Sequence, residues 1–356
     1  MSKKIAFFIR SLHLGGAEKQ SILLVEELSK FYEVYLVVLN KEGKLIARTK
    51  NIKNIIFLEG NFLRKITQLF LLLKNNQINF LFNFLPVNNI LGSIIGKIAG
   101  VNYIFNGIRG AKIKKSIVKM KLQLFLSNYI VSGVISNSHK GRISYANYGY
   151  KIKKITVIHN IIENYKSARS LEKNKKIKIL SVGRFVKEKD YPTMLKAISE
   201  LVLLTENKLY NDWELVIVGY GALELELKSI VKGYNLTNRV RFLPGDNIKV
   251  KEQYFNSDIY ISTSKYEGLS NTIMEAMSYG IPVIATDAGD SSYLVKDNYN
   301  GFVCQVSDYE SISCGLLKLL KSENLRVQLG ANSIKVLEKD FSKESIIKKY
   351  IKIIEQ

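Results

Sequence analysis

The strongest structural signal in this chain of 356 residues lies in residues 266–287, which read Tyr-Glu-Gly-Leu-Ser-Asn-Thr-Ile-Met-Glu-Ala-Met-Ser-Tyr-Gly-Ile-Pro-Val-Ile-Ala-Thr-Asp. This segment predicts the end of a strand, a glycine loop, a helix and a second strand. The first turn of such a helix carries unpaired N–H groups and the positive end of the helix dipole, which suits a diphosphate. Glu267 and Glu275 flank this predicted anion site. Two other interpretations stay open, because Glu275 fits a capping box with Thr272 and Glu267 could be a solvated loop carboxylate beside Lys265.

The same alternation of apolar strand-like runs and longer helical patterns extends over the rest of the chain, which predicts parallel sheets covered by crossover helices. In the first half we expect strands near residues 5–9, 34–39, 55–58, 78–84, 103–106, 134–136 and 155–158. In the second half we expect strands near 177–182, 214–218, 240–243, 258–262 and 283–285, and terminal helices at 312–320, 325–337 and 342–354.

The length suggests two domains, and a polar stretch without periodicity at residues 163–176 suggests where they join. We expect a basic Rossmann-like domain at 1–165, a linker at 166–176, a second Rossmann-like domain at 177–338, and a C-terminal helix at 339–356 that packs back towards the first domain. The predicted fold class is therefore α/β, with two doubly wound parallel sheets facing one another across a cleft. Ligands of such sheets lie beyond the carboxyl ends of the strands.

The net charge of +22 is distributed unevenly. Residues 1–170 hold 27 Lys and Arg against 7 Asp and Glu, whereas residues 171–356 hold 26 against 24. Between Glu59 and Glu163 there is no acidic residue. The first half is therefore expected to meet something anionic, which could be nucleic acid, an anionic membrane face or a phosphorylated substrate.

Several classes of protein are disfavoured. The two cysteines, Cys304 and Cys314, form no CxxC pair, so neither a disulfide framework nor a zinc site is supported, and a reducing cytoplasm is expected. The apolar run near the N-terminus is too short for a signal peptide, and no run reaches the roughly 18 residues of a spanning helix. No histidine lies in a metal pattern such as HExxH, and neither a GxSxG elbow nor a Walker loop is present.

A second group of candidate residues follows the first predicted strand of the second domain, where residues 182–190 read Val-Gly-Arg-Phe-Val-Lys-Glu-Lys-Asp. Arg184 and Lys189 could neutralise the charge that develops on a leaving diphosphate. The alternative is that both are ordinary surface cations without a role in a site. Gly219 and Gly221 suggest a dinucleotide loop, but Glu224 stands where its third glycine should be, which weakens that interpretation.

Together these motifs resemble the large retaining glycosyltransferase family four, which carries two glutamates separated by seven residues, then Ala-Met and Gly-x-Pro-Val-Ile-Ala-Thr, and upstream Gly-Arg followed by Glu-Lys-Gly. The resemblance implies the GT-B fold, a nucleoside-diphosphate sugar as substrate, and no cofactor or metal. It implies that Glu267 lies at the donor sugar, that Glu275 binds the ribose hydroxyls, and that Arg184 and Lys189 hold the diphosphate; Glu267, Arg184 and Lys189 form the expected catalytic set. The donor-binding set that it implies is Gly183, Arg184, Lys189, Gly219, Gly221, Gly268, Leu269, Ser270, Asn271, Thr272 and Glu275.

On the acceptor side the resemblance is thinner. Gly15 and Gly16 follow the first predicted strand and open a helix, which could make a small anion or sugar site or only a tight turn. His13 lies beside this loop, where a cleft role and a satisfied loop histidine are both open. Many family members carry His-Gly where this chain reads Asn-Gly-Ile-Arg-Gly at 106–110. Arg109 could replace that histidine, and a cation there would more naturally meet a phosphate than act as a base.

Residues 111–126 read as a basic amphipathic helix, with Ile113, Ile117, Met120 and Leu124 along one face and lysines around it. Such a helix could lie on an anionic bilayer, or it could simply cover the sheet with a solvated lysine face.

The function predicted from these patterns and from the resemblance is retaining, metal-independent transfer of a sugar from a UDP-linked donor to a polyprenyl-diphosphate-linked glycan in cell-surface polysaccharide synthesis, of capsule or O-antigen type. The protein is expected in the cytoplasm, peripherally associated with the membrane and without a nucleic-acid partner. A nucleotide-sugar epimerase of similar fold is the alternative enzyme. A basic nucleic-acid-binding protein is the alternative outside enzymes, although aromatic residues are not interleaved with the basic cluster.

Overall fold

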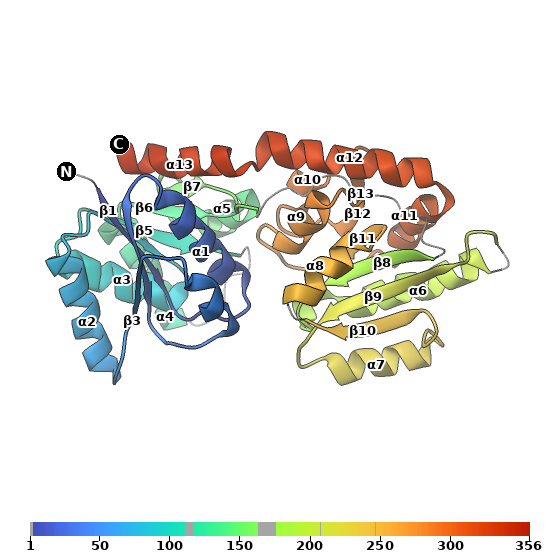
Figure 1. Cartoon of the computed structure of the whole chain (residues 1–356), viewed down its shortest axis with the longest axis horizontal. Coiled ribbons are helices and arrows are strands. Elements are labelled where there is room, and N and C mark those ends of the chain that lie inside the picture. The colour runs from blue at the N-terminus through green and yellow to red at the C-terminus, as the bar shows by residue number, and fades with distance from the viewer. Residues whose placement is uncertain (1–2, 111–116, 163–175, 207, 246) are drawn as a thin grey trace. The chain divides into compact units, whose positions relative to one another are not determined.

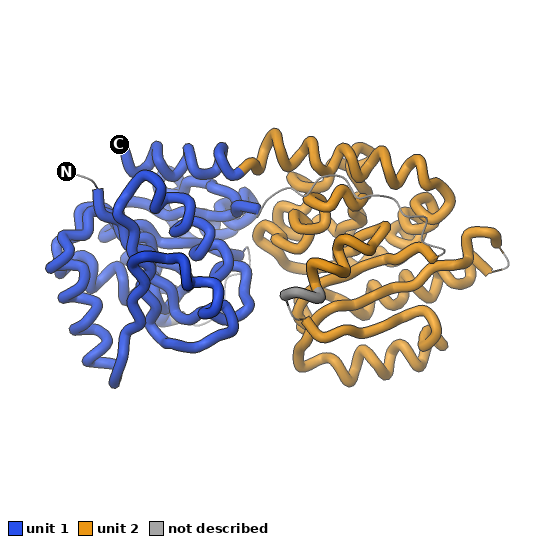
Figure 2. Tube along the Cα trace, viewed as in Figure 1, with its two compact units in different colours: residues 1–163, 343–356 blue, residues 164–342 orange. Residues whose placement is uncertain are grey.

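The computed structural model describes residues 3–110, 117–162, 176–206, 208–245 and 247–356. The chain divides into two compact units (Figure 2), of which unit 1 comprises residues 1–163 and 343–356 and unit 2 comprises residues 164–342. The linker expected at 166–176 lies, except for residue 176, outside the described residues. Each unit is built on its own parallel sheet, and the two are described separately.

Unit 1 holds a seven-stranded sheet in the order β3-β2-β1-β4-β5-β6-β7, in which every neighbouring pair is parallel (Figure 1). The strand order reverses between β1 and β4, as in doubly wound folds. The strands are β1 Lys4–Ile9, β2 Glu33–Val38, β3 Asn54–Phe57, β4 Phe80–Asn83, β5 Tyr103–Ile108, β6 Gly133–Ser136 and β7 Ile155–Val157. Because both faces of this sheet are covered, its strands read as continuous apolar runs.

Helices cover both faces of the unit 1 sheet and create two cores. On one face α1 and α13 pack against Phe7 and Ile9, and on the other face α2, α3, α4 and α5 pack against Ala6 and Phe8. The helices are α1 Gly16–Leu28, α2 Phe62–Asn75, α3 Pro86–Ile98, α4 Ile117–Phe125, α5 His139–Asn147 and α13 Lys343–Glu355. Short helical turns span Lys44–Thr49, Leu126–Ile130 and Ile152–Lys154.

The C-terminal helix α13 is part of unit 1, although it is separated in sequence from the rest of that unit (Figures 1 and 2). Its residues Ile346 and Tyr350 are buried in the core beneath α1. Lys343 Nζ lies 2.9 Å from Glu27 Oε1 of α1. The chain therefore returns to its first domain and is held there by both apolar and ionic contacts.

Unit 2 holds a six-stranded parallel sheet in the order β10-β9-β8-β11-β12-β13. The strands are β8 Ile177–Val182, β9 Trp213–Gly219, β10 Val240–Pro244, β11 Ile259–Ser262, β12 Val283–Thr286 and β13 Gly301–Cys304. The helices are α6 Tyr191–Thr205, α7 Glu224–Gly233, α8 Asn247–Phe255, α9 Asn271–Ser278, α10 Ser291–Leu294, α11 Tyr309–Lys321 and α12 Glu323–Asp340, with a short turn at Lys187–Lys189.

Strand β13 was not expected from the sequence. It is a four-residue edge strand that begins with Gly301, and a glycine weakens a strand pattern. The structure explains the glycine, because a Cβ at this position would lie 2.0 Å from the carbonyl oxygen of Val283 in β12.

Among the described residues, no helix is both long and apolar enough to cross a membrane. Part of the expected basic helix, residues 111–116 with Ile113, lies outside the described residues. The rest forms α4, in which Met120 is buried against the sheet and Leu124 is half-buried, so this face of α4 covers the sheet.

Candidate functional site

Most of the predicted site residues of unit 2 lie at the carboxyl edge of its sheet. Strand β8 pairs with β9 on one side and with β11 on the other, so the loops that follow these three strands lie next to one another. The direction of the connections changes between β8 and β11, and open α/β sheets bind ligands at such a point. The sheet therefore brings together loops that are about 80 residues apart in the sequence.

Glu267 and Lys189, predicted from separate motifs, form an ion pair between Lys189 Nζ and Glu267 Oε1. Ser264 Oγ donates a hydrogen bond of 2.9 Å to the same carboxylate oxygen. The two side chains are only 20% and 16% exposed, so water screens their attraction less than it would screen a surface pair. A substrate that uses either charge has to rearrange this pair.

The Lys189 loop is fixed by the residue that follows it. Asp190 has the left-handed backbone conformation, with φ 48° and ψ 47°, which asparagine and aspartate adopt more readily than most residues. The family pattern has glycine at this place. The Thr263 hydroxyl donates to the Asp190 carbonyl at 3.0 Å, and Lys265 Nζ lies 3.1 Å from Asp190 Oδ1. Asp190 therefore joins the loop after β8 to the loop after β11.

The predicted donor-binding glycines let the loops after β8 and β9 approach each other. A Cβ at Gly219 would lie 2.0 Å from the Gly183 carbonyl oxygen, and a Cβ at Gly221 would lie 2.5 Å from the Phe185 carbonyl oxygen. A Cβ at Gly183 would lie 2.9 Å from the Tyr191 hydroxyl oxygen. These glycines thus have a packing role in the unit itself.

Helix α9 begins at Asn271, with Ser270 as its N-cap residue. The capping-box interpretation of Glu275 is therefore wrong, because Thr272 lies inside the first turn rather than at the cap. Because α9 follows the loop at residues 263–270 after β11, its first turn lies at the carboxyl edge of the sheet. The helix dipole adds positive potential at this place.

Glu275 is held by a tyrosine that the sequence patterns did not indicate. The hydroxyl of Tyr254, in α8, donates a 3.0 Å hydrogen bond to Glu275 Oε2. Burial, followed by the charge of Glu275, raises the pKa of the Tyr254 phenol well above its ordinary value. The ring of Tyr254 stacks on Tyr279 with centroids 5.7 Å apart. A fully buried, protonated donor therefore orients this carboxylate.

The backbone of the Glu267–Leu269 loop rests on the turn after β12. Gly289 has φ +58°, and a Cβ there would lie 2.3 Å from the Gly268 carbonyl oxygen. The N–H of Asp290 donates to the same oxygen at 2.8 Å. The sequence patterns did not indicate this support, because it depends on a contact through space rather than on a local motif.

Four further predicted positions complete the edge. Arg184 is exposed directly after β8, in the loop that also carries Lys189. Leu269 is buried under the loop, whereas Asn271 and Thr272 are half-buried in the first turn of α9. The edge thus combines two cations, two carboxylates and a helix N-terminus, which together can hold a polyhydroxylated diphosphate.

The predicted acceptor-side glycines lie between β1 and α1 in unit 1. Gly15 is the N-cap of α1, and a Cβ there would lie 2.1 Å from Glu18 Oε2. The carboxylate of Glu18 is thus folded back over this helix end, where the sequence predicted a site for an external anion. His13 is mostly exposed, with Nε2 3.6 Å from Glu42 Oε1.

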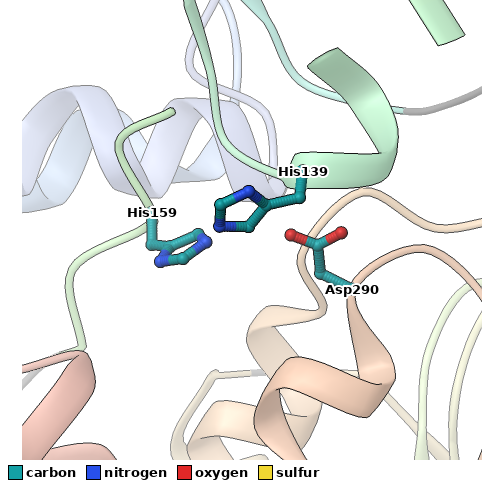
Figure 3. A group of neighbouring side chains, drawn as sticks. All are labelled: His139, His159 and Asp290. Atoms are coloured by element: carbon teal, nitrogen blue, oxygen red, sulfur yellow. The ribbon is translucent and has the colours of Figure 1, made fainter. Parts of the chain in front are cut away.

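Arg109 lies at the carboxyl edge of the unit 1 sheet. Its guanidinium carbon is 4.0 Å from the centroid of the Phe84 ring, and Nη1 donates to Asn160 Oδ1 at 3.4 Å. Stacking and hydrogen bonding fix the orientation of this cation. Nearby, His139 and His159 pack edge to face with ring centroids 5.3 Å apart. Figure 3 shows the two imidazole rings close together.

Comparison with known proteins identifies relatives for both units. Residues 163–336 match the family model described as glycosyl transferases group 1. An uncharacterized glycosyltransferase of Haemophilus influenzae is 33% identical over 198 residues, a match that covers 54% of this chain and 54% of that protein. The chain thus spans about half the length of this curated relative.

A relative that matches over its whole length is the Campylobacter jejuni N-acetylgalactosamine-N,N'-diacetylbacillosaminyl-diphospho-undecaprenol 4-alpha-N-acetylgalactosaminyltransferase, which is 27% identical with 99% of each chain covered. Among solved structures, Anabaena HepE in complex with UDP-glucose superposes with a TM-score of 0.87 at 17% identity, covering 99% of each chain. The predicted fold class is confirmed as two Rossmann-like parallel-sheet units of the GT-B type.

Proposed function

We propose that the chain is a retaining glycosyltransferase of the glycosyl transferases group 1 family, whose model matches residues 163–336. Its donor is a nucleoside-diphosphate sugar, UDP-linked, and its acceptor is a polyprenyl-diphosphate-linked glycan. The observation that carries the proposal is the carboxyl edge of the unit 2 sheet. There Glu267, which pairs with Lys189, lies in the loop before α9. Glu275, which accepts a hydrogen bond from Tyr254, lies in α9 itself. The first turn of this helix, which suits an anion, is between them in the sequence.

The proposed acceptor is supported by the names of the relatives and by the charge of unit 1. The Campylobacter enzyme named above and a UDP-Gal:alpha-D-GlcNAc-diphosphoundecaprenol alpha-1,3-galactosyltransferase of Escherichia coli, 26% identical with 78% of each chain covered, both act on diphosphoundecaprenol-linked glycans. A diphosphate-linked acceptor is anionic, and the 15 Lys and Arg between Glu59 and Glu163 stand without a single acidic residue. This positive charge also supports the proposal that the protein acts at the cytoplasmic face of an anionic membrane.

The proposed reaction breaks the bond between the anomeric carbon of the sugar and the diphosphate oxygen, and forms a bond from that carbon to an acceptor hydroxyl oxygen. The acceptor proton passes to the departing diphosphate on the same face, which keeps the anomeric configuration. Arg184, Lys189 and the N–H groups that open α9 stabilise the developing charge, and fixed donors of this kind act without a metal. When the donor binds, Lys189 exchanges part of its contact with Glu267 for the diphosphate, and this leaves Glu267 to meet the sugar.

The division of roles between the two glutamates is tested by titrating UDP into the wild type, Glu275→Ala and Glu267→Ala. We expect Glu275→Ala to weaken UDP binding about tenfold or more, because the ribose loses a charge-assisted hydrogen bond. We expect Glu267→Ala to keep UDP affinity and to lose sugar transfer. Equal losses of UDP affinity in both variants would contradict this assignment, and sugar conversion without any acceptor would favour an epimerase.

A further inference from the structure

The helices α2, α3 and α4 form one layer over a single face of the unit 1 sheet, with α3 packed against both of its neighbours (Figure 1). Their inward residues Leu69, Ile95 and Met120 fill the core beneath the layer. Helices that cover a sheet ordinarily turn a polar face outward. In this layer the outward faces also carry large exposed apolar side chains.

The apolar residues on these outward faces follow helical spacing. On α4 and the turn after it, Val118, Leu122, Phe125 and Tyr129 stand at i, i+4, i+7 and i+11, and all four are exposed. On α3, Ile94 and Ile98 are one turn apart, and Ile98 is 70% exposed. We use the name outer apolar surface for Leu63, Ile94, Ile98, Val118, Leu122 and Phe125, all exposed in this layer.

The helices that carry the outer apolar surface also carry exposed cations. The exposed cations of the same three helices are Arg64, Lys74, Lys97, Lys119 and Lys121. No Asp or Glu occurs anywhere between Glu59 and Glu163 to offset them. At the edge, Lys151 Nζ lies 4.3 Å from the centroid of the Tyr129 ring, so an amphipathic aromatic side chain stands next to a cation.

We propose that the outer apolar surface inserts into an anionic lipid bilayer, with the lysines of these helices at the level of the headgroups. The inference rests on the proposed function. It goes beyond attraction by net charge, because it assigns part of the binding energy to aliphatic and aromatic side chains that enter the bilayer. A second copy of this chain is a poorer partner, since two surfaces of the same positive charge repel. Single-stranded nucleic acid would need stacking rings, whereas five of these six side chains are aliphatic.

The proposal predicts that vesicle binding has an electrostatic and an apolar contribution. Flotation with vesicles of phosphatidylcholine and phosphatidylglycerol in equal parts can measure both. Electrostatic attraction falls steeply at about 1 M salt, where the screening length is roughly 3 Å, whereas apolar insertion persists. We expect the wild type to remain partly bound at high salt. The double variant Val118→Ser/Phe125→Ser should bind about a hundredfold less tightly, at roughly tenfold per inserted side chain, and high salt should release it completely.

A matched control is Leu225→Ser/Val327→Ser, which removes two exposed apolar side chains from unit 2 and should bind vesicles as the wild type does. An unchanged melting temperature and unchanged UDP affinity establish that Val118→Ser/Phe125→Ser is folded. Complete release of the wild type by salt, equal binding by the two double variants, or a concentration-dependent dimer without vesicle binding would each overturn the proposal. Because UDP affinity reports on unit 2, failure of the membrane proposal and failure of the transferase proposal are distinguishable.

Discussion

The hydrogen bond from Tyr254 to Glu275 allows a sharp test of how the nucleotide end of the site is built. The substitution Tyr254→Phe keeps the buried ring and its stacking on Tyr279 but removes the hydroxyl that donates to Glu275 at 3.0 Å. A hydrogen bond to a charged group contributes about 1.5–3 kcal/mol. Removing this hydrogen bond lowers the folding stability. It also weakens ligand binding, because the Glu275 carboxylate is no longer held in one orientation towards the ribose.

We therefore expect the Kd for UDP to rise about tenfold in Tyr254→Phe, which corresponds to about 1.4 kcal/mol, and the melting temperature to fall by roughly 3–6 °C. Isothermal titration calorimetry measures the first change and differential scanning fluorimetry the second. The matched control is Tyr234→Phe, which removes an exposed hydroxyl at the end of α7 and should change neither quantity.

The double variant Tyr254→Phe/Glu275→Gln distinguishes orientation from general destabilisation. If Tyr254 acts through Glu275, its effect on UDP affinity should nearly vanish once the carboxylate is gone, giving a coupling of about 1–2 kcal/mol. Additive effects, or a Tyr254→Phe variant that binds UDP as tightly as the wild type, would refute the reasoning.

The pH dependence of stability follows mainly from the burial of Tyr254 and secondly from the charge of Glu275, which together raise the pKa of the phenol. Because the folded state raises the pKa of the phenol, the stabilisation is complete below the unfolded tyrosine pKa near 10 and is lost as the pH rises above it.

Three further outcomes are expected from the described contacts. Gly289→Ala, which places a Cβ 2.3 Å from a backbone oxygen at φ +58°, should lower stability by about 3 kcal/mol and the melting temperature by roughly 10 °C; a shift below 2 °C would contradict the loop support described above. Asp190→Val should destabilise more than Asp190→Asn in urea unfolding, since valine is poorly tolerated in the left-handed region, and equal midpoints would argue against that strain. A thiol reagent at pH 8 should label exposed Cys314 and spare Cys304, whose pKa burial raises to about 12; peptide mapping that finds both labelled would contradict the burial of Cys304.

Much of the architecture could be predicted because buried parallel strands are long apolar runs. Of the thirteen strands in the described part of the chain, twelve were expected within a few residues of their observed positions. Strand β13 was missed because Gly301 interrupts the apolar pattern, and its need for a glycine arises only from the neighbouring β12 backbone. Local patterns therefore identify strands that carry their own signal, but not an edge strand that depends on its neighbour.

The site could be predicted only in part for a similar reason. Glu267 and Lys189 lie in loops after adjacent strands, and parallel topology alone brings such loops together. The contributions of Tyr254 and Gly289 could not be predicted, because they act on residues about 20 positions away through packing. The capping-box interpretation failed by two residues, since α9 begins at Asn271 rather than after Thr272. The apolar outer side of α4 was not predicted either, because the predicted helix had one apolar face with lysines around it.

The most direct test of the central claim is a transfer assay with purified protein, UDP-linked sugars and a short-chain polyprenyl-diphosphate glycan, with the product examined by NMR. The account predicts acceptor-dependent release of UDP and a new glycosidic bond with the anomeric configuration of the donor. It also predicts that EDTA leaves the rate unchanged and that Glu267→Gln lowers it by about a hundredfold or more. A product of inverted configuration, loss of activity with EDTA, or full activity in Glu267→Gln would contradict the account.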